Sequence, residues 1–291
     1  MNEHASPRRT PVLMAVHAHP DDESSQTGGT LARYAATGWR TVLITCTDGS
    51  QGDDAKGAKP GHPGHDPRRV AAHRSRELDA AAATLGIGDL IMLGYPDSGI
   101  PGEADPLPPP EAFSRRPLPT MVRELAGLLR AHRPDVLLTY PPNGFSGHPD
   151  HIRTHDLVSA ALRTLSATPA FPAPQLHYIA LSRSRLASLT RAARAALGPD
   201  VWLPPEEMAV DDADITTAID ITAYWETKLA ALAAHASQSD AAALLRSFTA
   251  AGQHDSATHV EEYVRAGRPT GPGSTPEPGF RIRNHGRPID G

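Results

Sequence analysis

The chain has 291 residues, of which 39% are hydrophobic and 21% charged, a balance typical of a globular protein with a substantial core. It excludes collagen-like and wholly disordered chains, and no apolar run approaches the roughly 20 residues that cross a bilayer. The net charge of −5 is spread along the chain without a basic cluster, so we expect small-molecule partners and neither nucleic acid nor membrane. The polar first ten residues lack the apolar core of a signal peptide, and a cytoplasmic location is expected.

Short apolar runs alternate with helical patterns over the first 180 residues, which predicts a Rossmann-like α/β fold with a mostly parallel sheet flanked by helices. The expected strands are Val12–His17, Thr41–Cys46, Leu90–Leu93, Val136–Tyr140 and His177–Leu181. Helices are expected over Arg74–Leu85 and from Leu118 to a stop before Pro134. The aperiodic segments Gly49–Asp66 and Ile100–Pro119 are predicted to be long loops, of the kind that form lids or binding loops.

After residue 181 the pattern is looser. It predicts, in chain order, a helix near Leu186–Leu197, a strand at Thr217–Ile221, and helices near Ala223–His235 and Ala241–Ala250. The last 25 residues are rich in proline and glycine and are interpreted as a poorly ordered or wrapped tail. We therefore predict a catalytic core over 1–182, a mixed segment over 183–266 that packs on the core and closes the pocket, and a tail over 267–291.

Two clusters of histidine and acidic residues follow two of the predicted strands. The first is His17-Ala18-His19-Pro20-Asp21-Asp22-Glu23-Ser24, and the second is Gly147-His148-Pro149-Asp150-His151. In an open sheet ordered 3-2-1-4-5, the first and fourth strands are neighbours where the winding reverses, and the loops after them face each other across the ligand crevice. The two clusters are therefore expected to share one site.

The composition of these clusters indicates a metal centre. The only cysteine, Cys46, excludes a site made of cysteines alone, so a metal must be held by His, Asp or Glu. Imidazoles and carboxylates suit Zn²⁺, whose catalytic sites commonly combine three protein ligands with an open position for water. We predict one zinc ion per chain, held by His19, Asp22 and His151.

Three further residues of the clusters are candidates for catalysis. Asp21 adjoins a predicted ligand and is placed to take a proton from water. His148 could donate a hydrogen bond to the developing oxyanion or protonate the departing amine. Asp150 could orient an imidazole ligand as a supporting carboxylate.

Structural roles are the alternatives for single residues. An acid or serine of the first cluster, taken alone, could simply cap the helical pattern that follows. His155, one turn beyond His151, could replace a ligand, although a position facing the core or the substrate is favoured. We interpret His62 and His65 as solvated loop residues and Cys46 as a buried structural residue. The joint placement of the two clusters at facing strand ends favours the metal site.

The two motifs also resemble the PIG-L/LmbE family of zinc-dependent N-deacetylases and amidases. The resemblance runs from about residue 13 to 181 and returns near 220–238. Besides the two motifs it is carried by Thr45-Cys46-Thr47-Asp48-Gly49, Asp97-Ser98-Gly99 and His235-Ala236-Ser237-Gln238. It implies the same three zinc ligands, the same base and the same assisting histidine, and it adds Arg74 and Asp97 as residues that line a sugar pocket.

What the resemblance implies about function is the hydrolysis of an amide on a 2-amino sugar. The segments 13–25 and 94–102 favour a mycothiol S-conjugate amidase over the alternative, an N-acetylglucosaminyl deacetylase of the mycothiol pathway or of a specialised-metabolite pathway. Two positions depart from the mycothiol enzymes. Ser146, assigned here to substrate binding, stands where a tyrosine is typical, and Gln26 lies where the amidase branch has a lysine.

Two other classes of protein are weighed against this hydrolase. A dinucleotide-binding oxidoreductase is disfavoured because His-Pro-Asp-Asp follows the first strand, where Gly-x-Gly-x-x-Gly would be required. A non-catalytic, metal-containing sugar-binding protein would retain the ligands but release no amine from acylated amino sugars. The sequence makes no prediction of oligomeric state.

Overall fold

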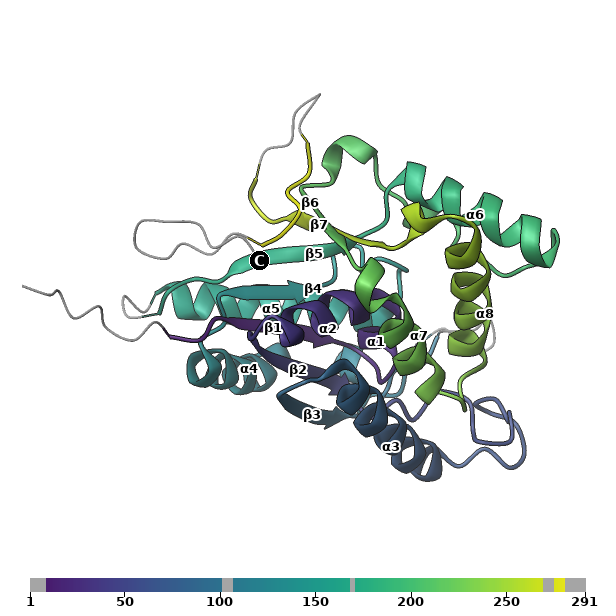
Figure 1. Cartoon of the computed structure of the whole chain (residues 1–291). Helices are drawn as coiled ribbons and strands as arrows, with labels where there is room; N and C mark the ends of the chain where they lie inside the picture. Colours follow the sequence, from purple (N-terminus) through teal and green to yellow (C-terminus); the bar gives the residue numbers. More distant parts are fainter. Residues whose placement is uncertain (1–8, 101–106, 168–170, 269–274, 281–291) are drawn as a thin grey trace, which may run out of the picture.

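The centre of the fold is a seven-stranded sheet with the strand order β3-β2-β1-β4-β5-β7-β6 (Figure 1). The structure, a computed structural model, describes residues 9–100, 107–167, 171–268 and 275–280. The strands are β1 (Val12–His17), β2 (Arg40–Thr47), β3 (Asp89–Tyr95), β4 (Val136–Thr139), β5 (Gln175–Ala180), β6 (Thr217–Asp220) and β7 (Val260–Arg265). The first five strands pair in parallel, which confirms the predicted order 3-2-1-4-5, whereas β7 pairs antiparallel with both β5 and β6.

Helices cover both faces of the sheet, and this explains why the central strands β1 and β4 are almost entirely apolar. They are α1 (Asp22–Gln26), α2 (Gly28–Ala36), α3 (Pro67–Leu85), α4 (Leu118–His132), α5 (Pro149–Ser166), α6 (Arg183–Leu197), α7 (Trp225–Ala234) and α8 (Ser239–His254). In β1, Leu13 and Ala15 pack into the core that includes Leu31 of α2. The alternate residues Met14 and Val16 pack with the side chains of α4 and α5 on the opposite face.

The helix α3 begins seven residues before the predicted start at Arg74. Asp66 caps it by accepting hydrogen bonds from the backbone N–H groups of Arg68 and Arg69, and Pro67 occupies the first turn. A capping acid followed by proline is a local signal for a helix start, and it lies at the end of a segment that the composition alone assigns to a loop. The predicted stop at Gly86 is confirmed, since Gly86 ends the helix with a φ of 70°.

The strand β7 is the one strand of the described sheet that the sequence did not predict. It inserts between β5 and β6, with Ile179 opposite Tyr263 on one side and Thr217 opposite Tyr263 on the other. Such pairing joins residues far apart in the chain and leaves no local mark apart from a short run of alternating residues. The two last strands thus continue the sheet of the first five, and the division of the chain at residues 182 and 266 stays a prediction.

Part of the predicted tail packs on the core. Phe280 is buried, and its backbone N–H donates to the hydroxyl of Tyr34 at 2.8 Å. The rest of this predicted tail after residue 268, apart from 275–280, lies outside the described residues, as do residues 101–106 of the second predicted loop. None of the described helices has the length and apolar character needed to cross a membrane.

Candidate active site

A cleft of about 750 Å³ opens at the carboxyl ends of β1 and β4, where the order of the parallel strands reverses. It is lined by residues that follow β1, by residues between β4 and α5, and by the amino end of α8. All the predicted site residues but one line this cleft: His19, Asp21, Asp22, Arg74, Asp97, Ser146, His148 and His151. The exception, Asp150, is completely buried behind it.

Three side-chain atoms of the predicted ligands form a nearly regular triangle at the bottom of the cleft. His19 Nδ1 lies 3.3 Å from His151 Nε2 and 3.3 Å from Asp22 Oδ2, and the last two atoms are 3.5 Å apart. Tetrahedral zinc with ligands at about 2.0 to 2.2 Å requires ligand atoms separated by about 3.3 to 3.6 Å. The three side chains are almost fully buried, and groups of the protein surround them.

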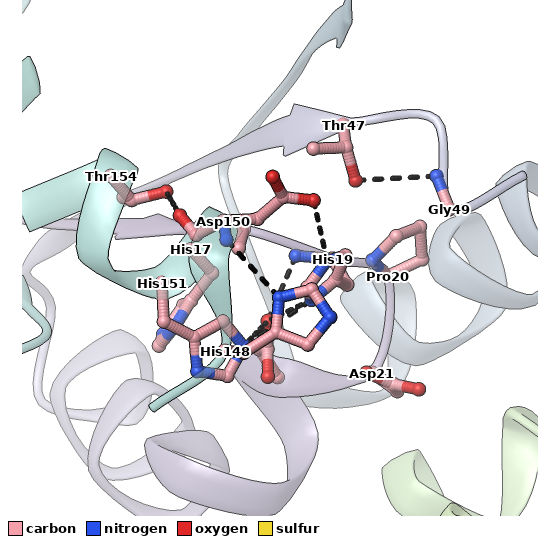
Figure 2. A network of polar contacts seen from close by, with 12 residues as sticks. His17, His19, Pro20, Asp21, Thr47, Gly49, His148, Asp150, His151 and Thr154 are labelled. Carbon is pink, nitrogen blue, oxygen red and sulfur yellow. Dashed lines mark hydrogen bonds and ion pairs between the residues drawn. The ribbon is translucent and has the colours of Figure 1, made fainter. Parts of the chain in front are cut away.

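The imidazoles of His19, His148 and His151 gather within this region (Figure 2). One nitrogen from each ring lies within 4.8 Å of the others, so the three could hold a metal ion. His19, Asp97 and Asp150 form a second such group among the described residues, since one ligand atom of each lies within 4.8 Å of the others. The donor set is rich in nitrogen and carboxylate oxygen, which is the chemistry that zinc accepts.

The far side of each predicted ligand is hydrogen-bonded to a partner. His19 Nε2 lies 3.2 Å from Asp150 Oδ2, and His151 Nδ1 lies 3.1 Å from the carbonyl oxygen of Gly144. A carboxylate or carbonyl that accepts the outer N–H of an imidazole leaves the inner nitrogen with its lone pair free for a metal. Asp150 is therefore placed beside the ring of His19, rather than beside that of its neighbour His151.

Asp22 is held by groups from three parts of the chain. Its Oδ2 accepts the backbone N–H of His19 at 2.8 Å and the hydroxyl of Tyr140 at 2.7 Å, and its Oδ1 accepts the side-chain amide of Gln26 at 2.8 Å. Burial alone would raise the pKa of Asp22, but His151 and His19 hold this pKa well below its ordinary value. The carboxyl group is thus kept ionised.

His148 differs from the other two imidazoles because its Nδ1 accepts a hydrogen bond from the backbone N–H of Asp150, at 3.1 Å, as the cap of α5. Since that nitrogen must supply a lone pair, the proton of the neutral ring is on Nε2. Burial, reinforced by the neighbouring His19 and His151, lowers the pKa of His148 to about 2. His148 is therefore a neutral hydrogen-bond donor.

Asp21 lies at the turn between β1 and α1 with a left-handed backbone, φ 119°. Burial raises its pKa to about 6, although the guanidinium of Arg74 opposes this shift. Arg74 donates to Asp21 Oδ2 at 2.9 Å and to the carbonyl oxygens of Pro20 and Gly49 at 2.5 and 2.8 Å. Arg74 is 4% exposed, and its two terminal nitrogens bind the walls of the cleft, whereas its Nε has no partner among the described residues.

Two other predicted substrate-binding residues have partners in the protein. Asp97 accepts the backbone N–H groups of Gly99 and Gln51, at 2.8 and 3.3 Å. Ser146 is exposed in the cleft, and its Oγ lies 3.1 Å from His151 Nδ1. The roles of Arg74, Asp97 and Ser146 in binding substrate stay predictions.

Sequence reasoning missed two supporting groups. The ring of Tyr140, at the end of β4, stacks on that of His151 with centroids 4.2 Å apart while its hydroxyl binds Asp22. Ser98 donates its backbone N–H to Asp150 Oδ2 at 2.9 Å, and its hydroxyl also binds this carboxylate. Ser98 belongs to one of the segments that carried the family resemblance, whereas Tyr140 was assigned only as the last residue of a strand.

The histidines set aside in the sequence lie away from the ligand triangle. His155 Nδ1 binds the carbonyl oxygen of Tyr140 at 3.0 Å, and His65 Nε2 binds that of Gly52 at 2.9 Å. Cys46 is buried and free, and burial raises the pKa of its thiol to about 12. A thiol of this kind is a poor nucleophile.

Comparison with known proteins extends these observations. Residues 14–162 match the family described as PIG-L: GlcNAc-PI de-N-acetylase. A curated relative, the 1D-myo-inositol 2-acetamido-2-deoxy-alpha-D-glucopyranoside deacetylase of Thermobispora bispora, is 39% identical over 239 residues, which cover 78% of each chain. Relatives of this name support the deacetylase alternative, and the preference for a conjugate amidase is not confirmed.

Solved structures share the fold at lower identity. The 4-carboxy-2-hydroxymuconate hydratase of Pseudomonas putida matches with a TM-score of 0.61 and 18% identity, covering 91% of this chain and all of the other. The N,N'-diacetylchitobiose deacetylase of Pyrococcus horikoshii matches with a TM-score of 0.56 and 22% identity, covering 87% and 83%. Since a hydratase and a deacetylase share it, the fold does not decide the reaction. The family match and the curated relatives do: this chain belongs to the PIG-L/LmbE family and is a deacetylase, a hydrolase of linear amides.

Proposed function

We propose that this chain removes the acetyl group from an N-acetylglucosamine that is linked to an inositol, with one zinc ion as cofactor. The names of the curated relatives supply the substrate class. The observation that carries the proposal is the triangle of His19 Nδ1, Asp22 Oδ2 and His151 Nε2, whose sides of 3.3 to 3.5 Å fit a tetrahedral ion.

The choice of Asp22 over His148 as the third ligand follows from hydrogen bonding. If His148 Nε2 bound a metal, the proton of the neutral ring would have to sit on Nδ1, where it would point at the backbone N–H of Asp150. Asp22 has no such conflict, because an ionised carboxylate carries no proton whose position a metal would have to change. We therefore assign His19, Asp22 and His151 as ligands and leave His148 as a donor.

When bound, zinc would act as a Lewis acid that polarises the amide carbonyl and makes water more acidic. Asp21 accepts the proton of the water whose oxygen attacks the carbonyl carbon, and the Arg74 guanidinium fixes the direction of its carboxylate. The Nε2–H of His148 donates to the oxygen that becomes negative during the attack. When the carbon–nitrogen bond breaks, Asp21 returns the proton to the nitrogen, and a carboxylate and a free amine leave.

The later part of the chain closes this cleft. Gln238 donates its amide to the backbone carbonyl of Asp53 and accepts the backbone N–H of the same residue, both at 3.0 Å. Lys59 joins this contact by binding Ser239 at 2.8 Å. These bonds support the proposed role of the segment 183–266 as the wall that completes the pocket.

The test is metal analysis coupled to amine release from N-acetylglucosaminyl-inositol. Chelation should abolish release and added zinc should restore it. His19→Ala and His151→Ala should lose both metal and turnover, whereas His155→Gln, a matched control one turn further along α5, should keep both. Activity that survives chelation would overturn the mechanism, and bound metal without amine release from any acetylated amino sugar would favour a binding protein.

A further inference from the structure

A second cavity of about 110 Å³ adjoins the main cleft, and we call it the apolar annex. Its apolar walls are Phe145, Ile179, Leu189, Trp202, Leu244 and Phe248. Ser25, Gln26, Trp202 and Leu244 line both the annex and the main cleft, so the two spaces meet. Gln26 binds the ligand Asp22, which places this junction directly beside the reacting centre.

The main cleft and the annex differ in chemistry. The main cleft presents Gln51, Asp53, Lys59 and Asp240, whose polar groups suit the hydroxyls of a sugar. Three charged side chains also line the annex, and each binds a group of the protein, although Arg185 Nε has no hydrogen-bond partner among the described residues. Lys228 Nζ binds Glu261 at 2.6 Å, and Arg185 donates to the carbonyl oxygen of Thr258 at 3.4 Å.

An amide is planar and prefers the trans form, so its nitrogen substituent and its acyl chain leave the carbonyl in opposite directions. With the carbonyl at the triangle and the sugar in the main cleft, the acyl chain points away from the sugar, and the annex is an adjoining space with mainly apolar walls. We propose, on the basis of the deacetylase function inferred above, that the annex binds the acyl group of the substrate and admits linear acyl chains longer than acetyl.

The volume of the annex limits the length of the acyl chain that it can hold. Its volume is that of about three or four water molecules at roughly 30 Å³ each, more than the single methyl group of an acetyl needs. Butanoyl and hexanoyl groups are the expected fit. Met208 lines both the annex and a further groove of about 220 Å³, so this side chain limits how far a chain extends.

The experiment compares kcat/KM for N-acetyl-, N-butanoyl-, N-hexanoyl- and N-decanoylglucosamine with the zinc-loaded enzyme. We expect an increase of about threefold per added methylene until the annex is full, and then a fall. Leu244→Phe should lower the ratio of hexanoyl to acetyl turnover toward one. Leu245→Phe, the same change at the next position of α8 and outside the annex, should keep the wild-type ratio. Met208→Ala should move the optimum to longer chains.

Failure of the inference is distinct from failure of the proposed function. Acetyl release with no gain for longer chains, or a ratio that Leu244→Phe leaves unchanged, would overturn the acyl site alone. If no substrate releases amine, the proposed function fails. A crystal structure of the chelated protein with N-hexanoylglucosamine then still decides the annex, because the alkyl chain lies either against Phe248 and Leu244 or elsewhere.

Discussion

The chain before residue 182 and the chain after it contribute different things to one cleft. The earlier part supplies the triangle and the groups that support it, from the loop after β1 and from the segment between β4 and α5. The later part supplies most of the annex, through Trp202, Met208 and the α8 residues Leu244 and Phe248. The candidate reactive groups thus lie at the ends of buried parallel strands, whereas most of the annex wall comes from helices and loops after β5.

This contrast predicts two kinds of variant. Changes to the triangle and to the groups that support it should affect every acyl chain equally, because they alter the bond-breaking step. Changes in the annex should alter the dependence on chain length. The ratio of hexanoyl to acetyl turnover distinguishes the two kinds, and a variant of the triangle or of its supporting groups that changes this ratio strongly would break the comparison.

The largest effect is expected at the proposed base. Asp21→Asn keeps an oxygen to accept the Arg74 hydrogen bond but cannot take a proton, so turnover should fall by about 10² to 10⁴ while bound zinc is retained. Metal content and amine release measure the two properties. Asp79→Asn, on the exposed surface of α3, is the control. Near-normal turnover in Asp21→Asn would refute the assignment.

His148→Ala should follow, with kcat reduced by about 10² to 10³, the usual effect of losing one oxyanion donor. Zinc content should be unchanged, since the neutral ring is assigned as a donor and not as a ligand. Loss of the metal in this variant would instead support the set of three imidazoles. Elemental analysis of the purified variant distinguishes the two cases.

Tyr140→Phe should weaken zinc binding by about 10- to 100-fold, the range typical of groups that orient metal ligands. The change removes the hydroxyl that holds Asp22 at 2.7 Å and leaves the ring stacked on His151. Competition with a chelator gives the affinity, and turnover at saturating zinc should recover most of the wild-type rate. An unchanged affinity would show that Asp22 needs no such support.

The smallest effect is expected on stability, at His177 of β5, the last parallel strand before the later part of the chain. His177 of β5 is buried, and neither ring nitrogen has a hydrogen-bond partner among the described residues. Burial, with the charges of Arg265 and Arg268, lowers its pKa to about 3. Because the folded pKa lies below the unfolded value near 6.5, stability is full above pH 6.5 and falls as pH drops toward 3.

Replacing His177 tests whether its protonation lowers the stability of the protein in acid. His177→Phe should reduce the acid dependence of the unfolding free energy by on the order of 1 kcal/mol per pH unit between pH 6.5 and 3. Urea unfolding at several pH values measures it, with His62→Phe as the exposed control. Identical slopes in wild type and variant would show that His177 does not titrate on unfolding.

The sequence predicted the parallel part of the fold because its strands are short apolar runs that bury both faces. The same reasoning placed the two motifs at adjacent strand ends, and the structure brings His19, Asp22 and His151 together there. Their roles in binding zinc remain predictions. The family resemblance itself was confirmed by the match over residues 14–162.

Other features depend on tertiary packing and had no local signal. The pairing of β7 with β5 joins residues about 85 positions apart in the chain, and no short-range sequence pattern predicts it. Tyr140 looked like the end of a strand, and only the fold brings its hydroxyl to Asp22 from 118 residues away. The start of α3 is different, because Asp66 and Pro67 form a recognisable signal that the loop-like composition concealed.

The left-handed backbone of Asp21 means that the residue best for stability at this position differs from the residue proposed for catalysis. A side chain at φ 119° costs on the order of 1 to 3 kcal/mol, which glycine would avoid. Asp21→Gly should therefore melt at a higher temperature than Asp21→Ala, although both are inactive, and thermal unfolding of the pair measures the difference. A substitution that makes the protein more stable at this position would thus remove the carboxylate that we propose as the base.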